Sequence, residues 1–393
     1  MSFGILALIV LAGLAGPLLG SGRRAFVPVV VGELAAGVVI GDTGGRWLNP
    51  SGSTVSFLYE VGFAMLMFAA GMLVPIRRPG IARGLRVGLA AAVLVGALAV
   101  PAGFGVAAAT GVHHAAIYAL LLASGSAAVL LPVLEEEGLA DDARALTLMA
   151  QVGIADVSAI VALPIVMQPG RALHAALGGL AVAAAAAAVL VVAKLLRGTE
   201  IVRDLRRASK QRVWALDLRM SLLVLFTLSW LAQRSGTSIL IAGFAVGLIV
   251  AIVGGPRRLS RQVTGIAAGF FIPLFFVVLG ARLDLRALVN HPSNLEIAGL
   301  LLVAGVAVHL AAARATRQPL GAGLAATAQL GLPAGVVTLG LQQHVISAGT
   351  AAAILLAALG TVAICPVGVA LLRRQNAGKQ IVRAEHPHVP SDE

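Results

Sequence analysis

Residues 151–160 read Gln-Val-Gly-Ile-Ala-Asp-Val-Ser-Ala-Ile, and they place one carboxylate, Asp156, near the middle of an apolar run over residues 143–167. A helix of about 20 apolar residues is long enough to cross a lipid bilayer. An ionisable side chain at the centre of a bilayer is costly, and such side chains mark ion pathways and proton relays. The stretch therefore predicts a membrane helix with a functional aspartate inside it.

The composition extends this pattern to the whole chain. Of the 393 residues, 59% are hydrophobic and 12% are charged, whereas soluble domains carry roughly 25% charged residues. The 29 Lys and Arg residues outnumber the 17 Asp and Glu residues, but they lie between apolar segments rather than on one face, which argues against nucleic-acid binding. We also find no nucleophile–base set and no metal cluster, so we expect a transporter without a cofactor and not an enzyme.

Apolar runs between Gly, Pro and charge breaks predict an all-α polytopic membrane protein with about 13 transmembrane helices. They are expected at residues 3–20, 26–41, 55–75, 85–109, 114–134, 143–167, 172–196, 214–232, 237–254, 264–281, 295–313, 321–343 and 348–372. The longest polar loop is expected after the seventh helix.

The distribution of Lys and Arg tests this count, because cytoplasmic loops collect basic residues. Loops that follow odd-numbered helices, together with the C-terminal tail and the adjoining helix ends, hold 24 of the 29 Lys and Arg residues. The opposite side of the membrane holds the other five, which are Arg46, Arg171, Arg234, Arg282 and Arg286. The N-terminus is therefore expected outside and the C-terminus in the cytoplasm of a cell inner membrane. Two six-helix halves joined by a linker helix then have opposite orientations, as in the inverted repeats of secondary transporters.

Two predicted helices contain residues that favour a break, at matching places in the two halves. The fifth carries Ser124, Gly125 and Ser126, and the twelfth carries Gln329, Gly331, Pro333 and Gly335. Unwinding there would expose half-helix ends and free carbonyl groups, which can bind ions near the midplane. The alternative is that these small residues only allow close helix packing.

Asp156 and His309 are the candidate titrating residues. A proton and a metal ion compete for the same carboxylate oxygen atoms, which is the minimum chemistry of an exchanger, and we expect Ser124 and Ser126 to help bind the cation. His309 lies deep in the eleventh helix, and a histidine titrates near pH 6.5 when unperturbed. It could pair with Asp156 when the site is empty, or it could be a neutral packed residue.

Six stretches of this sequence, taken together in their order and spacing, resemble the sequence motifs of a known transporter superfamily. They are residues 30–41, 61–72, 123–129, the Asp156 segment, residues 271–280 and residues 329–335. With them, the chain resembles the monovalent cation/proton antiporter superfamily, particularly its bacterial sodium/proton and potassium/proton exchangers, from about residue 5 to residue 372. Asp156 matches the family's ion-binding aspartate. Two departures leave the cation and the stoichiometry open: Ala155 stands where many relatives have Asp, Asn or Gln, and His309 where many have Lys or Arg.

The resemblance implies crossed broken helices and an elevator-like movement of a core domain against a dimerisation domain, in a homodimer that serves pH homeostasis. The expected division is 1–80 and 214–290 for the dimerisation domain, 81–168 and 291–373 for the core, 169–213 for the linker helix and its loop, and 374–393 for a short cytoplasmic tail. The expected partners are Na+ or K+, H+ and the lipid bilayer. Two other functions stay open: symport of an organic anion with sodium, and a membrane sensor that transports nothing.

Overall fold

The computed structural model describes residues 2–20, 29–73, 81–112, 114–139, 142–212, 214–254, 257–283, 286, 288 and 292–385, and all regular structure in these residues is helical. Eleven described helical segments are long and apolar enough to cross a membrane. Two shorter apolar helices, Val29–Ile40 and Ile239–Val253, lie where the second and ninth spans are predicted. The predicted all-helical membrane protein is confirmed, and the count of thirteen spans stays a prediction.

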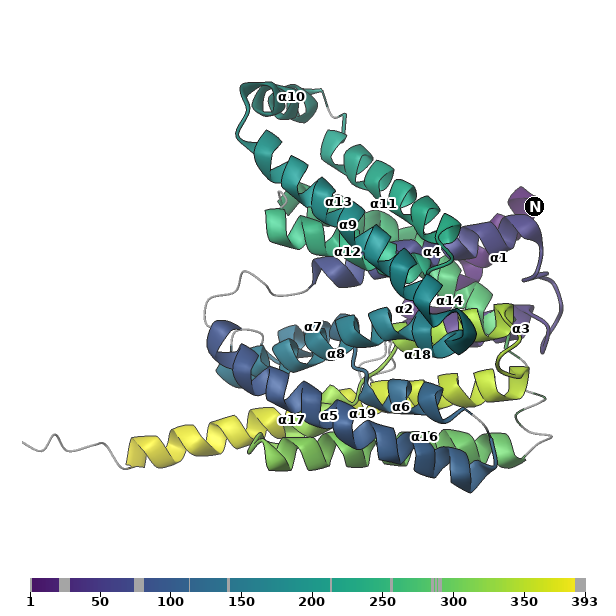
Figure 1. Ribbon diagram of the computed structural model, residues 1–393, viewed down its shortest axis with the longest axis vertical. Helices are drawn as coiled ribbons and strands as arrows, with labels where there is room; N and C mark the ends of the chain where they lie inside the picture. The colour runs from purple at the N-terminus through teal and green to yellow at the C-terminus, as the bar shows by residue number, and fades with distance from the viewer. Residues whose placement is uncertain are drawn as a thin grey trace, which may run out of the picture.

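The helices form two layers that lie one above the other in Figure 1. The lower layer contains α5 (Ile81–Thr110), α6 (Ala115–Ala123), α7 (Ala127–Glu136), α8 (Ala143–Met167), α16 (Pro292–Ala315), α17 (Leu320–Ala326), α18 (Gly331–Gln342) and α19 (Ala348–Glu385). The upper layer contains α1 (Phe3–Gly13), α2 (Ala15–Gly20), α3 (Val29–Ile40), α4 (Ser53–Met72), α11 (Leu216–Arg234), α12 (Ile239–Val253), α13 (Arg257–Ile266), the π-helical turn η2 (Ala267–Phe271) and α14 (Ile272–Ala281). A short 3-10 turn (Pro169–Arg171) leads into α9 (Ala172–Arg197), which contacts α8 of the lower layer and α11 and α12 of the upper one.

Glycines let the helices of the upper layer approach backbone to backbone. A Cβ atom at Gly37 of α3 would overlap the carbonyl oxygen of Val277 in α14, and a Cβ atom at Gly280 would overlap the carbonyl oxygen of Leu34. Small residues at such contacts are typical of membrane helices, where packing replaces the hydrophobic effect as the driving force. The glycine-rich stretch over residues 30–41 therefore has a packing role in this structure.

A hydrogen bond connects the two layers between α4 and α18, and Arg282 of the upper layer packs beside it. The Tyr59 hydroxyl of α4 shares a hydrogen bond with the Thr338 hydroxyl of α18. The Arg282 guanidinium lies 4.2 Å from the centroid of the Tyr59 ring, and it donates a hydrogen bond of 2.9 Å to Ser56 Oγ. A movement of one layer along the other would have to break the Tyr59–Thr338 contact.

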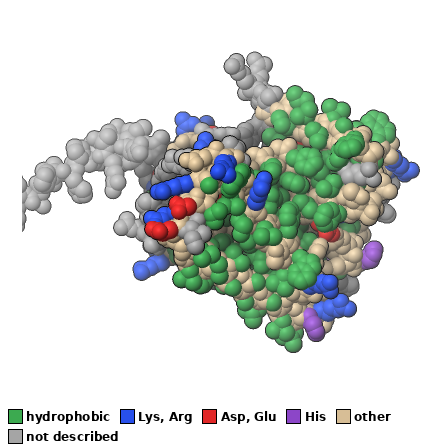
Figure 2. Space-filling view, turned by 90° about the horizontal axis from the view of Figure 1, so that it is seen from above, with side chains coloured by type: hydrophobic (Ala, Val, Ile, Leu, Met, Phe, Trp, Pro, Cys, Tyr) green, Lys and Arg blue, Asp and Glu red, His purple; other side chains and the backbone are tan. Residues whose placement is uncertain are grey.

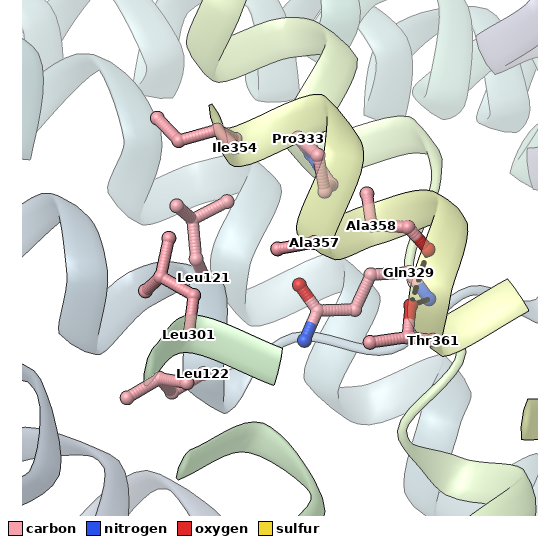
Figure 3. A pocket seen from close by; sticks show the side chains of 9 residues that line it. All are labelled: Leu121, Leu122, Leu301, Gln329, Pro333, Ile354, Ala357, Ala358 and Thr361. Atoms are coloured by element: carbon pink, nitrogen blue, oxygen red, sulfur yellow. Dashed lines mark hydrogen bonds between the residues drawn. The ribbon is translucent and has the colours of Figure 1, made fainter. Parts of the chain in front are cut away.

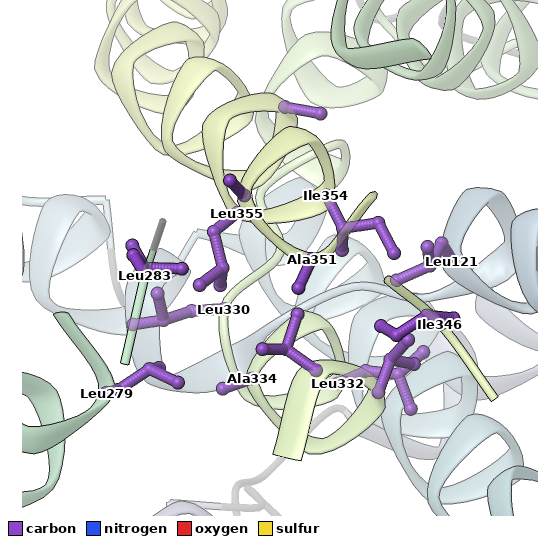
Figure 4. Close-up of a cluster of buried hydrophobic side chains, with 14 of the residues drawn as sticks. Leu121, Leu279, Leu283, Leu330, Leu332, Ala334, Ile346, Ala351, Ile354 and Leu355 are labelled. Carbon is purple, nitrogen blue, oxygen red and sulfur yellow. The ribbon is translucent and has the colours of Figure 1, made fainter. Parts of the chain in front are cut away.

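Apolar side chains surround the connection between α17 and α18. In Figure 4, Leu330 of that connection lies beside Leu355 of α19 and beside Leu283, and Leu332 of α18 lies toward Leu121 of α6, all of them buried. This packing keeps the irregular backbone between the two helices inside protein, where irregular backbone at membrane depth is tolerated.

The outer face of the upper layer is largely apolar. Hydrophobic side chains cover much of the centre of the face seen from above, and Lys and Arg gather toward one edge (Figure 2). The exposed apolar side chains of α9 and α11 include Leu177, Leu180, Leu223 and Trp230. Contiguous apolar surface of this kind suits contact with lipid or with another protein chain.

Two segments differ from the prediction. Residues 200–211, expected within a polar loop, form the helix α10 (Glu200–Gln211), whose first turn is capped by Thr199 Oγ1 accepting a 3.4 Å hydrogen bond from the Val202 N–H. The last span is predicted over residues 348–372, whereas α19 continues to Glu385. Hydropathy reveals only apolar helices, so a helix with a mostly charged surface is missed.

Candidate functional site

Asp156 lies in α8 with 5% of its surface exposed. Its carboxylate faces the backbone N–H of Ala127, the first residue of α7. Ser126, which precedes α7, makes no side-chain capping hydrogen bond to that helix. Asp156 therefore lies at the N-terminal end of α7, where the positive end of the helix dipole favours a charged carboxylate.

The first predicted break is present between α6 and α7. Ser124 and Ser126 have extended backbones, with φ −84° and ψ 166° for Ser124 and φ −142° and ψ 106° for Ser126. Both serines are buried. The Ser124 hydroxyl donates a hydrogen bond of 2.9 Å to the Leu121 carbonyl oxygen at the end of α6. The sequence thus placed this break correctly, while cation binding by the two serines stays a prediction.

The second break lies between α17 and α18, at residues 327–330. Gly331, Pro333 and Gly335, which the sequence offered as break positions, instead form the first turns of α18. Proline is well tolerated in the first turn of a helix, where its missing N–H costs no hydrogen bond. These residues therefore mark the start of the second half-helix, and the unwound stretch comes just before them.

The two breaks are built alike and lie side by side. The Thr327 hydroxyl donates a 2.7 Å hydrogen bond to Leu324 O at the end of α17, as Ser124 does at the end of α6. A Cβ atom at Gly125 would lie 3.5 Å from the carbonyl oxygen of Ala326. This similarity supports the predicted relation between the two halves of the chain.

His309 of α16 faces the other half-helix end of the first break. It is 1% exposed, and neither ring nitrogen makes a hydrogen bond. The ring faces the backbone carbonyls of Ser124 and Leu122, at the negative end of the α6 dipole. No ion pair joins His309 to Asp156, both of which belong to the described part of the chain. The pairing proposed from the sequence is therefore absent from this conformation.

Thr361 is a polar group that the sequence did not indicate, and it lies beside Gln329 of the second predicted break. The Thr361 hydroxyl accepts a 3.1 Å hydrogen bond from the Gln329 backbone N–H. The Gln329 side chain borders a cavity of about 10 Å³, together with Leu121, Leu122 and Thr361 (Figure 3). That volume suffices for about one water molecule. A threonine within an otherwise apolar span is the signal that could have indicated Thr361.

The site can therefore hold one cation or one proton at a buried carboxylate. Asp156 lies at the positive end of α7, and His309 lies at the negative end of α6. Unwound backbone and buried hydroxyl groups lie between them, and such groups can replace part of the hydration shell of a small cation. Within the described residues no group of three His, Cys, Asp or Glu side chains suits a multivalent metal ion.

The family profile and the similar sequences point to the same protein family. The profile of the transmembrane sodium/hydrogen exchanger family matches residues 6–374. The chain is 23% identical over 374 residues to the "Putative Na(+)/H(+) antiporter YjbQ" of Bacillus subtilis (strain 168); the match covers 90% of this chain and 60% of YjbQ. It is 25% identical over 295 residues to a Na+/H+ antiporter of Enterococcus hirae, covering 72% of this chain and 73% of that protein.

The chain is also similar to a potassium-efflux protein and to the solved structure of an antiporter. The glutathione-regulated potassium-efflux system protein KefC of Enterobacter sp. (strain 638) is 24% identical over 272 residues, which cover 68% of this chain and 43% of KefC. The sodium proton antiporter MjNhaP1 from Methanocaldococcus jannaschii has the same fold, with a TM-score of 0.62 and 16% identity over 97% of this chain and 98% of that one.

Proposed function

The chain belongs to the sodium/hydrogen exchanger family, and we propose that it exchanges a monovalent cation, Na+ or K+, for H+ across the membrane, with Asp156 as the residue that binds both. The observation that carries this proposal is the buried Asp156 carboxylate, which faces the Ala127 N–H at the start of α7, beside the two broken helices. A charge so deep in the bilayer is a functional group by default.

The exchange follows from competition for one carboxylate. A bound cation neutralises the charge of Asp156, and a bound proton does the same, so either form of the site crosses the membrane at lower cost than the empty charged form. The hydroxyl groups of Ser124 and Ser126 add oxygen ligands for the cation. Because the two ligands exclude each other, movement of one in one direction is coupled to movement of the other in the opposite direction.

The two-layer arrangement supports an elevator-like movement. In this proposal the layer of α5–α8 and α16–α19 is the ion-carrying core, and the layer of α1–α4 and α11–α14 is a dimerisation domain held in a homodimer. The excess of Lys and Arg on one side supports an N-terminus outside and a C-terminus in the cytoplasm of a cell inner membrane. The same exchange would contribute to pH homeostasis.

The choice between Na+ and K+ is open to direct measurement. The similar proteins include antiporters named for Na+ and an efflux system named for K+. The chain spans 60% of the length of YjbQ and 43% of KefC, so the activities of those proteins are guides only. Proteoliposomes that contain a pH-sensitive dye, challenged in turn with Na+, K+ and Li+, would give the order of preference.

The test of the proposal is Asp156→Asn in the same proteoliposomes. The amide has nearly the same shape but neither titrates nor carries a full charge, so we expect a folded protein without cation-driven proton flux. Asp217→Asn, which changes a carboxylate of α11 in the other layer, is the matched control and should exchange normally. Normal flux in Asp156→Asn would refute the proposal. Wild-type cation uptake without proton movement would favour a sodium-coupled symporter, and no wild-type flux at all would favour a sensor.

A further inference from the structure

A second ionisable side chain lies buried in the membrane-spanning helices, away from the broken helices. Glu33 of α3 is 2% exposed. Its Oε2 atom makes no hydrogen bond, and no ion pair among the described residues includes it. A buried carboxyl group without a partner is expensive to keep in a protein interior. The proposed exchange through Asp156 does not use Glu33.

The Glu33 carboxyl group borders a cavity of about 240 Å³. The other lining residues are apolar or glycine, and they come from α1, α2, α3, η2 and α14. Three of them, Val10, Leu14 and Val29, are also 44%, 51% and 42% exposed. The cavity therefore opens toward the surroundings of the helix bundle.

A π-helical turn forms one wall of this cavity. Ala268, Gly269 and Phe270 of η2 line it, and a Cβ atom at Gly269 would meet no other atom within 4 Å. Single π-helical turns inside α-helices occur frequently at functional sites. The wall thus combines irregular backbone with open space next to a carboxyl group that lacks a partner.

The lining limits the chemistry of a ligand. An inorganic cation requires several oxygen ligands around it, and Glu33 is the one acidic or amide-bearing residue among those that line the cavity. On this measure one water molecule needs about 10–15 Å³, so the cavity is far larger than a single ion fills. The walls suit an alkyl chain, and the carboxylate suits a positively charged hydrogen-bond donor.

We propose that this cavity binds an aliphatic primary ammonium compound, whose ammonium group donates to Glu33 and whose alkyl chain lies against the apolar walls of α1, α2 and η2. The ammonium group has three donors, so it can satisfy the Oε2 atom. The site is separate from Asp156, and its ligand is not a transported ion. The amine is supplied either by a free alkylamine or by the headgroup of phosphatidylethanolamine.

The proposal is tested by covalent labelling in nanodiscs. Dicyclohexylcarbodiimide reacts with carboxyl groups in apolar surroundings. Labelling is measured by mass spectrometry in the Asp156→Asn variant as the loss of the unmodified peptide that contains Glu33, so that an N-acylurea and an amide formed with an added amine both count as labelling. In phosphatidylcholine nanodiscs we expect octylammonium chloride to slow this labelling at least tenfold and 1-octanol to leave it unchanged. Leu14→Trp, which fills the cavity, should abolish the labelling. Leu18→Trp, exposed and outside the cavity lining, should not.

Comparing the two nanodisc lipids distinguishes the two sources of the amine. Slow labelling in phosphatidylethanolamine nanodiscs without added amine would identify the lipid headgroup as the ligand, and protection by octylammonium alone would identify a free amine. Three results would overturn the proposal. The first is equal protection of Glu33 by 1-octanol, and the second is protection by NaCl or KCl in place of octylammonium. The third is a lack of Glu33 labelling in the folded Asp156→Asn protein with an unchanged cavity, as expected if a second copy of the chain fills the cavity.

Discussion

Asp156 and His309 face opposite ends of the two half-helices that meet at the first break. The α7 end offers the Ala127 N–H to Asp156, and the α6 end turns the carbonyl groups of Leu122 and Ser124 toward His309. A carboxylate suits the positive end of a helix dipole, and an imidazolium suits the negative end. The sequence indicated both residues from their depth in apolar spans. Their surroundings could not be predicted, because they depend on how α8 and α16 pack against the broken helix.

The two serines of this break allow a direct test of cation coordination. We expect Ser124→Ala and Ser126→Ala each to weaken cation binding by about 1 kcal/mol, roughly fivefold in apparent affinity, because one polar contact to the ion is lost. The measurement is the cation concentration that gives half-maximal proton flux. Ser158→Ala is the control, since its hydroxyl donates to Ile154 O on an exposed face of α8. Unchanged affinity in both variants would assign the stretch to helix packing alone.

His309 decides whether exchange moves net charge. If the imidazole takes up and releases a proton in each cycle, it adds a second proton and the exchange responds to membrane potential. It is buried without a hydrogen bond and without an ion pair to Asp156, so we expect it to stay neutral and the exchange to be electroneutral.

Flux under an imposed potential tests this expectation for His309. Wild type and His309→Gln should respond equally little to the potential. His309→Lys should weaken cation binding at high pH, because a base with a reference pKa near 10.4 keeps its charge where imidazole, near 6.5, has lost it, and a cation must then displace a charged partner. Strong acceleration of the wild type by the potential, absent in His309→Gln, would prove the electroneutral expectation wrong.

At the scale of the helices, charge and Gly/Pro breaks predicted most boundaries to within a few residues. The predicted span over 143–167 agrees with α8, Ala143–Met167. The second break was predicted less well, because Gly331 and Pro333 are compatible both with an unwound stretch and with the first turn of a helix. The charged helix α10 was missed because no apolar span identifies it.

Close packing of α3 against α14 gives a prediction for a single glycine. We expect Gly37→Leu to lower the stability of the protein by about 1–3 kcal/mol, the usual cost of overpacking, because its side chain would overlap the Val277 carbonyl oxygen. Thermal unfolding in detergent would measure the loss. Gly96→Leu is the control, since a Cβ atom at Gly96 meets nothing within 4 Å. Equal melting temperatures for the two variants would contradict the close contact.

At the scale of the whole molecule, two glycine contacts allow movement between the two layers to be tested. Met67 of α4 and Gly331 of α18 meet at the boundary between them, where a Cβ atom at Gly331 would lie 3.0 Å from the Met67 Cε atom. Leu302 of α16 and Gly360 of α19 make a similar contact within one layer, with a Cβ atom at Gly360 2.9 Å from Leu302 Cδ2. In both pairs a glycine faces the tip of a longer side chain, so two cysteines can replace each pair without overlap.

These two pairs distinguish an elevator-like movement from a fixed arrangement of the layers. In a Cys365→Ala background, which removes the single native cysteine, a short bifunctional thiol reagent would link either pair. We expect the linked Met67→Cys/Gly331→Cys protein to lose cation-driven proton flux, because α18 can no longer slide past α4, and to regain it when a cleavable linker is cut. The linked Leu302→Cys/Gly360→Cys protein should exchange normally, because both residues belong to one layer. Full exchange by a completely linked Met67–Gly331 pair would mean that ions cross without relative movement of the layers, and access would then have to change within the core layer itself, at the broken helices.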